Sequence, residues 1–266
     1  MRERILTAIV LGAVLVGVLL YAPAVAARGL FGLFVIAGAW EWAAFAGCTQ
    51  RGARLGFVLL VALVSVGWRL LADGPLGYEL LLRVAAAWWL LALLWLLLAP
   101  QRVNHLVAGR AALLSLPPIW IALSLVAERW TRGGQWVLFI LILAFAADTG
   151  AYFAGRAFGR TKLAPLVSPG KTWEGVLGGL ALAGLAAWAG ARWFAQPLAP
   201  MLLLCLLAAA FSVVGDLTES MLKRAAGMKD SGKLFPGHGG VLDRIDSALA
   251  ATPFMVLGLM HLGVGT

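Results

Sequence analysis

Long apolar runs, separated by short polar breaks, recur along this sequence from its first residues to its last. A helix needs roughly 20 mostly apolar residues to cross the hydrocarbon core of a bilayer. We predict nine such spans, at 5–26, 29–46, 55–72, 80–98, 111–127, 135–154, 175–194, 199–215 and 248–264. Only 12% of the residues are charged, against about 25% in soluble domains. The predicted fold class is therefore an all-α, polytopic integral membrane protein.

The distribution of Lys and Arg sets the predicted orientation. Short cytoplasmic loops retain positive charge, and most of the 21 Lys and Arg residues lie in loops that a cytoplasmic N-terminus would place on that side. We therefore predict a cytoplasmic N-terminus, an outer C-terminus and a cytoplasmic segment 216–247. The net charge of +9 lies along these loops, which favours anionic lipid headgroups and phosphate substrates over nucleic acid.

The first segment allows two interpretations. Its basic start, apolar stretch and Ala24-Val25-Ala26 ending are typical of a cleaved signal peptide. A retained first helix is the interpretation we favour. The orientation of the remaining spans is the same in both cases.

Polar residues divide the predicted single membrane domain, 1–266, into two halves. In 1–147 they lie mostly at helix ends, and after Glu3 in the N-terminal segment Glu41 is the only acid near a cytoplasmic end, so this half is predicted to be mainly scaffold. The half 148–266 is predicted to be catalytic, with cytoplasmic active-site loops. Its seven acids are Asp148, Glu174, Asp216, Glu219, Asp230, Asp243 and Asp246. Charges near a bilayer persist mainly where they pair, bind ions or meet substrate.

Two acidic helix faces lie at the two ends of the segment 216–247. The first continues the eighth span, with positions i, i+3, i+4 and i+7 occupied by Asp216, Glu219, Ser220 and Lys223. The second opens the ninth span and consists of Asp243, Asp246 and Ser247. A carboxylate pair suits Mg²⁺, which binds one or two carboxylates together with waters and phosphates. An ordinary solvated stripe is the alternative for the first face.

The loop between these faces combines glycines with cations. Pro236, Gly237, Gly239 and Gly240 prevent regular structure and allow backbone N–H groups to approach a ligand. The cations are Lys223, Arg224, Lys229 and Lys233. His238 either contacts a phosphate or makes a hydrogen bond within the loop. Such a loop suits a triphosphate.

A third polar segment, 168–175, precedes the seventh span. Ser168, Pro169 and Gly170 predict a turn. Thr172 is expected to cap the following helix, and Lys171 is expected to lie at the cytoplasmic end of that helix. The sequence Gly-Lys-Thr lacks P-loop spacing and is weak evidence by itself. Asp148 adds an acid at the end of the sixth span. Acids, cations and glycines at one membrane boundary together predict metal-assisted phosphoryl or nucleotidyl transfer involving a lipid.

A long fixed pattern runs through the acidic segment: Ser220-x-Leu222-Lys223-Arg224-x4-Lys229-Asp230-x-Gly232-x2-Phe235-Pro236-x-His238-Gly239-Gly240-Val241-x-Asp243-Arg244-Ile245-Asp246. It resembles, without departure, the signature of bacterial phosphatidate cytidylyltransferases, also called CDP-diacylglycerol synthases. The resemblance extends to 147–160 and 168–175. The N-terminal half is similar mainly in hydropathy.

This resemblance implies a reaction in which CTP and phosphatidic acid give CDP-diacylglycerol and pyrophosphate, with Mg²⁺ required. It implies that Asp216 and Asp243 are the leading metal ligands, that Glu219 and Asp246 support them, and that a second, monovalent cation such as K⁺ has room between them. It further implies a homodimer in the bacterial inner membrane, with the active site facing the cytoplasm and a lateral opening for lipid.

The residues so identified fall into two expected groups. The expected catalytic residues are Asp216, Asp243, Lys223, Arg224, Lys229 and His238. The expected substrate-binding residues are Lys171, Ser168, Thr172, Asp148, Gly239, Gly240 and Arg244. Which cation meets CTP and which meets phosphatidate stays open.

Two other classes of function compete with this interpretation. A related CTP-dependent transferase or kinase acting on another lipid or isoprenoid alcohol would share the same site chemistry. A cation-coupled anion transporter would place its acids near the membrane midplane between repeated halves. We detect no internal repeat, and the acids gather at one predicted surface, so transport is disfavoured.

Overall fold

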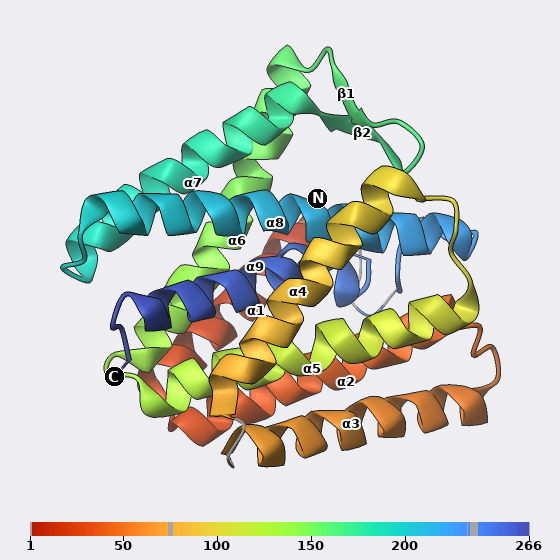
Figure 1. Cartoon of the computed structure of the whole chain (residues 1–266), viewed down its shortest axis with the longest axis horizontal. Helices are drawn as coiled ribbons and strands as arrows, with labels where there is room; N and C mark the ends of the chain where they lie inside the picture. The colour runs from red at the N-terminus through yellow and green to blue at the C-terminus, as the bar shows by residue number, and fades with distance from the viewer. Residues whose placement is uncertain (1, 74–76, 233, 235–238, 266) are drawn as a thin grey trace.

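Nine α-helices and one short hairpin make up the part of the chain that the computed structural model describes, residues 2–73, 77–232, 234 and 239–265 (Figure 1). The helices are α1 (Arg2–Tyr21), α2 (Ala24–Phe45), α3 (Arg51–Asp73), α4 (Gly77–Leu98), α5 (His105–Arg129), α6 (Gly133–Phe158), α7 (Trp173–Trp193), α8 (Leu198–Ala225) and α9 (Leu242–His261). The hairpin consists of β1 (Lys162–Ala164) and β2 (Ser168–Thr172). Each predicted apolar run lies mainly on one of these helices, although the first, 5–26, extends beyond α1 into the start of α2.

Seven helices in the described ranges, α2 to α8, are long and apolar enough to cross a membrane. The chain is therefore a multi-pass integral membrane protein. The predicted total of nine spans and the predicted orientation of the termini stay predictions, because length and composition do not test them.

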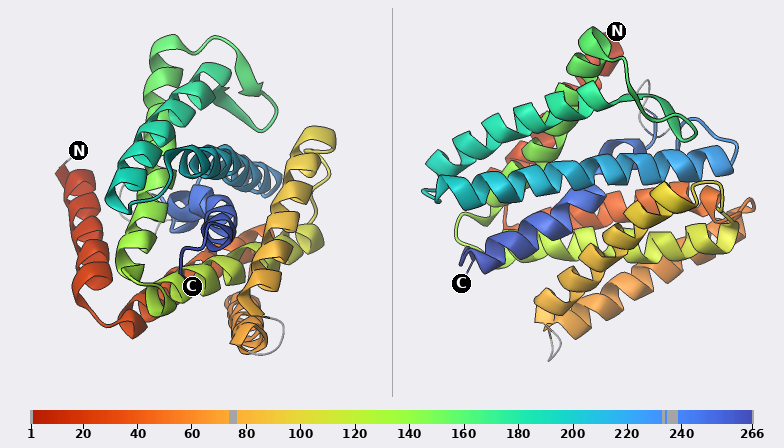
Figure 2. Two further views of the ribbon diagram at one scale, coloured as in Figure 1. Left: turned by 60° about the vertical axis from the view of Figure 1, so that its left-hand side comes forward. Right: turned by 45° about the horizontal axis from the view of Figure 1, so that its top comes forward.

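Helix α9 lies inside the bundle, where it packs against α4, α5, α6 and α8, while α1 stands at the edge beside α6 (Figure 2). After Asp246 its buried side chains are small or apolar and include Ala250, Met255 and Val256. A helix that is apolar all round belongs in an interior. The first turn of α9, with its acids, is thereby held in the middle of the molecule.

Small residues bring α6 and α7 into close contact. Gly179, Ala183 and Ala187 recur every four residues on α7 and are all buried. A Cβ on Gly178 would overlap the Cβ of Ala154 on α6, and one on Gly179 would lie 2.7 Å from the carbonyl oxygen of Ala147. Small residues at this spacing allow a neighbouring helix to approach closely.

The hairpin corrects one sequence prediction. Ser168, Pro169 and Gly170 belong to strand β2, which pairs antiparallel with β1, whereas the turn lies at 165–167. A proline is tolerated in a two-stranded hairpin because the N–H that it lacks can face away from the partner strand. The predicted helix cap is confirmed, since Thr172 Oγ1 accepts a hydrogen bond from the Gly175 N–H at 3.2 Å.

Candidate active site

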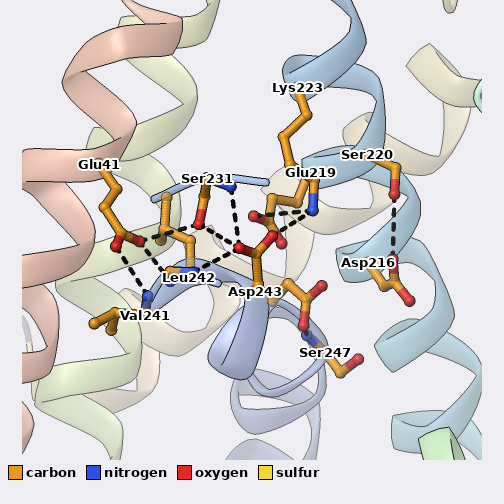
Figure 3. A network of polar contacts seen from close by, with 12 residues as sticks. Glu41, Asp216, Glu219, Ser220, Lys223, Ser231, Val241, Leu242, Asp243 and Ser247 are labelled. Atoms are coloured by element: carbon orange, nitrogen blue, oxygen red, sulfur yellow. Dashed lines mark hydrogen bonds and ion pairs between the residues drawn. The ribbon is translucent and has the colours of Figure 1, made fainter. Parts of the chain in front are cut away.

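The acidic faces of α8 and α9 come together as the sequence predicted (Figure 3). Asp216, Glu219 and Lys223 lie on one side of α8, and Asp243 lies in the first turn of α9. Lys223 joins the two helices, because its Nζ lies 2.6 Å from Asp243 Oδ1 and 3.4 Å from Glu219 Oε1. The side chains of Lys223 and Asp243 are only 12% and 11% exposed, so this ion pair is largely shielded from water.

The second oxygen of Asp243 orders the loop before α9. Asp243 Oδ2 accepts hydrogen bonds from the backbone N–H groups of Ser231 at 3.0 Å and Gly240 at 2.8 Å. The Ser231 hydroxyl lies 2.9 Å from the same oxygen. Gly239 adopts a left-handed conformation, with φ of 82°, just before this contact. Asp243 is thus fixed by three groups of its own loop as well as by Lys223.

Glu41 belongs to the site by its contacts, and the sequence did not predict its position there. It lies on α2, and Oε1 accepts a hydrogen bond from the Val241 N–H at 3.0 Å while Oε2 accepts one from the Leu242 N–H at 2.9 Å (Figure 3). The Ser231 hydroxyl lies 3.0 Å from Oε2. Glu41 is only 6% exposed. A carboxylate from the predicted scaffold half therefore holds both ends of the active-site loop.

The contacts of Glu41 also explain two glycines of the loop. A Cβ on Gly232 would overlap the Glu41 carboxylate, and one on Gly240 would overlap both Glu41 and the Ser231 hydroxyl. At these positions the backbone comes close to a side chain of the same protein. The Gly240 N–H donates to Asp243 in this structure, and the substrate-binding role expected of Gly240 stays a prediction.

Lys171 reaches the same region from β2. Its Nζ lies 2.6 Å from Asp216 Oδ2, and the Ser220 hydroxyl donates to Asp216 Oδ1 at 3.3 Å. Both partners of this pair are partly open to solvent, with side-chain exposures of 24% and 29%. Such a pair contributes little to stability by itself, so both groups remain available to a ligand.

Asp148 and Asp246 meet through Ser247. The Ser247 hydroxyl donates to Asp148 Oδ1 at 2.9 Å, and its N–H donates to Asp246 Oδ1 at 2.8 Å. Asp148 lies on α6, so this contact adds a third long helix to the site. Asp148 and Lys171 line one cavity, and their predicted roles in the site stay predictions.

A polar cavity of about 450 Å³ lies where these elements meet, between α6, α7, α8, the hairpin and the start of α9. Its charged lining residues are Asp148, Arg156, Lys171, Asp216, Asp243 and Asp246. Thr172, Gly155 and Gly175 line it as well. Four acids against two bases give the cavity an excess of negative charge. A triphosphate would be repelled from such a cavity unless a further cation entered with it.

The donor set of this cavity fits a Mg²⁺ ion. All of the acids supply oxygen, the ligand atom that Mg²⁺ prefers. Glu219, which is 2% exposed, does not line the cavity, but its two carboxylate oxygens accept no hydrogen bond within the described ranges and Oε1 lies 3.4 Å from Lys223 Nζ. Among the described residues no three acid, histidine or cysteine side chains form a ready-made cage. The fit is therefore to an ion that completes its shell with water and substrate phosphates.

Several predicted residues lie elsewhere. Arg224 and Lys229 are exposed and, like Ser168, are not among the lining residues of the polar cavity in the described ranges. Arg244 is exposed and lines a different, apolar cavity. His238 and Lys233 lie outside the described residues, together with Pro236 and Gly237.

Fold and site together define a multi-pass helical membrane protein with an acidic, lysine-containing cavity of ligand size. The chain matches the model of the Cytidylyltransferase family over residues 2–262 and belongs to that family. It is 42% identical to the phosphatidate cytidylyltransferase of Pseudomonas aeruginosa, with 100% of this chain and 99% of the relative covered. It is also 42% identical to the enzyme of that name from Haemophilus influenzae, with 96% of each chain covered, and 33% identical to that of Staphylococcus saprophyticus, with 69% and 71% covered.

Proposed function

We propose that this protein is a phosphatidate cytidylyltransferase, which converts CTP and phosphatidic acid into CDP-diacylglycerol and pyrophosphate, a step of phospholipid biosynthesis. The carrying observation is the polar cavity, where Lys171, Asp216 and Asp243 converge from separate elements; Lys171 pairs with Asp216, and Lys223, outside the lining, pairs with Asp243. Full-length similarity to relatives of that name supports the same reaction.

In this reaction an oxygen of the lipid phosphate attacks the α-phosphorus of CTP, and the bond to the β-phosphate breaks to release pyrophosphate. The task of the protein is to hold two anionic reactants in line and to balance the charge that develops on the leaving group. Lys171 and Arg156 face the cavity and supply fixed positive charge for phosphate oxygens. Ser231 and the Gly240 N–H hold the carboxylate of Asp243 in place.

Mg²⁺ is the cofactor that the acids of this cavity fit. We propose that Asp216 and Asp243 hold it, with support from Glu219 and Asp246, and that a monovalent cation such as K⁺ binds beside it. Bound Mg²⁺ supplies charge neutralisation at the phosphates. Lys223 keeps the carboxylates of α8 and α9 at one place through its contacts with Glu219 and Asp243.

We further propose that the protein spans the bacterial inner membrane nine times, as a homodimer, with its N-terminus and active site on the cytoplasmic side and its C-terminus outside. The position of Lys and Arg in the loops supports this orientation. Labelling of single added cysteines from each side of sealed vesicles tests it, and an outer label in the loop 226–240 would contradict it.

One experiment tests the reaction and its alternatives. The purified protein is incubated with phosphatidate and each of the four nucleoside triphosphates, and pyrophosphate and lipid product are both measured. We expect pyrophosphate and CDP-diacylglycerol in equal amounts with CTP and Mg²⁺. Release of CDP in place of pyrophosphate would identify a lipid kinase and overturn the proposal.

A further inference from the structure

A second cavity, of about 360 Å³, lies between α1, α2, α5, α6 and α9. Its walls are almost entirely apolar and include Gly12 of α1, Phe31 of α2, Leu123 of α5 and Phe145 of α6. The volume falls in the range of small-molecule sites, about 300–1,000 Å³. We name it the apolar cavity.

The start of α9 separates the apolar cavity from the polar one. Asp243 and Asp246 line the polar cavity, whereas Arg244, Ile245 and Ala248 line the apolar cavity. Successive residues of a helix point in different directions around its axis, so one helical turn serves both cavities. A ligand with a phosphate at this turn would have the catalytic acids on one side and apolar walls on the other.

Arg244 is the one charged residue among the described residues that line the apolar cavity. A guanidinium within a membrane protein is retained where it meets an anion, and its planar donors match a phosphate. The charge and the apolar walls are complementary to the phosphate and the acyl chain of an anionic lipid.

The apolar cavity also has an entrance. Leu11 of α1 and Phe145 of α6 line it and are 37% and 46% exposed, so the cavity is not closed on this side. Helix α1 stands at this edge beside α6 (Figure 2). An acyl chain can therefore enter sideways without leaving an apolar environment.

We propose that the apolar cavity binds an acyl chain of phosphatidate, with the lipid phosphate at Arg244 beside the polar cavity. This inference rests on the proposed function and adds where the lipid lies. An acyl chain gains little free energy on moving from the bilayer to an apolar wall, because both are equally apolar. The role of the cavity is therefore to position the lipid phosphate, which controls the rate of an in-line reaction.

Filling the cavity tests this placement. A Cβ on Gly12 meets no atom within 4 Å, so Gly12→Phe places a ring at the cavity wall without a clash at Cβ. Gly17 lies on the same helix, has equally open space and does not line the cavity, which makes Gly17→Phe the matched control. Both variants are assayed in nanodiscs with dioleoyl phosphatidate and, separately, with dihexanoyl phosphatidate, whose chains are too short to depend on the cavity.

For Gly12→Phe we expect kcat/KM with dioleoyl phosphatidate to fall about tenfold or more, because the displaced chain misplaces the phosphate. The dihexanoyl lipid, the KM for CTP and the Gly17→Phe variant should be nearly unaffected. An equal change with both lipids, or no change with either, would overturn the inference. If the unaltered protein makes CDP-diacylglycerol from neither lipid, the proposed function fails. The binding measurement below still tests whether the apolar cavity binds phosphatidate.

Binding is measured without turnover by photolabelling. A phosphatidate with a diazirine on its acyl chain is activated in the absence of CTP, and the labelled peptides are mapped. We expect label near Phe31 and Leu123, removed by excess dioleoyl phosphatidate and weakened in Gly12→Phe. Label confined to the outer faces of other helices, or label in the cavity that excess phosphatidate leaves in place, would refute the placement.

Discussion

Replacement of Glu41 by glutamine keeps the shape of the side chain but removes a charge and one acceptor from the start of α9. The two oxygens of Glu41 accept hydrogen bonds from the Val241 and Leu242 N–H groups at 3.0 and 2.9 Å. A glutamine amide has one acceptor oxygen and one donor NH₂ group. In either orientation the NH₂ group faces a backbone N–H, so one buried donor loses its partner.

The expected energetic effect follows from these contacts. A buried donor without a partner costs about 1–3 kcal/mol. The hydrogen bonds that remain go to a neutral acceptor and are weaker, since bonds to ionised groups are roughly twice as strong. The total is about 2–4 kcal/mol, and every 1.4 kcal/mol corresponds to a tenfold change in population. If this free-energy cost destabilises the ordered conformation of the loop in the folded protein, kcat drops by about 30-fold to several hundred-fold.

The assay combines pyrophosphate release with hydrogen exchange. For Glu41→Gln we expect a lower kcat, a smaller change in the KM for CTP, and faster exchange at the Val241 and Leu242 amides. Glu79→Gln is the control, because Glu79 is an exposed acid on α4 whose described partners, Arg83 and His261, are exposed as well. A kcat within about twofold of the unaltered protein, with unchanged exchange at both amides, would refute the positioning role of Glu41.

Three further perturbations follow from the site and the bundle. Asp216→Asn and Asp243→Asn should each retain a folded, monodisperse protein but lose Mg²⁺-dependent transfer, and near-normal activity in both would remove them from the metal site. Lys171→Gln breaks a 2.6 Å ion pair with Asp216 at the cavity. We expect a clear rise in the KM for CTP or phosphatidate and only a small fall in the Tm, and unchanged kinetics would exclude a phosphate contact. Gly178→Val forces its Cβ into α6, so overpacking should lower the free energy of unfolding by about 1–3 kcal/mol and the Tm with it, whereas Gly184→Val on the same helix, with 3.7 Å to its nearest neighbour, should change neither much.

Local patterns predicted the helical parts of the site. The spacing of Asp216, Glu219 and Lys223 needs only helical periodicity, and α8 does continue through all three. The cap at Thr172 and the small-residue face of α7 also depend on neighbours in sequence. The turn at Ser168–Gly170 was misplaced because proline and glycine signal a turn only when no partner strand is near, and β1 supplies one.

The tertiary parts of the site could not be predicted in this way. Glu41 and its partners Val241 and Leu242 lie 200 and 201 residues apart in sequence, and no local pattern links them. The sequence did contain one signal for a role of Glu41: it is an isolated acid near a helix end in the apolar half 1–147. Such a charge is costly near a bilayer and requires a partner. The division of the start of α9 between two cavities likewise depends on which helices surround it.

The first turn of α9 joins these observations, because it has no side-chain cap of its own. Its N-cap residue is Val241, which makes no side-chain cap hydrogen bond, and the first N–H groups of the helix go to Glu41 of α2 instead. A substitution at Glu41 therefore moves the whole turn, including Asp243 toward the polar cavity and Arg244 toward the apolar one. Glu41→Gln should accordingly slow turnover of dioleoyl and dihexanoyl phosphatidate to the same degree, whereas Gly12→Phe should slow only the former. If Glu41→Gln discriminated between the two lipids as Gly12→Phe does, the turn would not act as one rigid unit, and the separation of the two cavities by α9 would have to be abandoned.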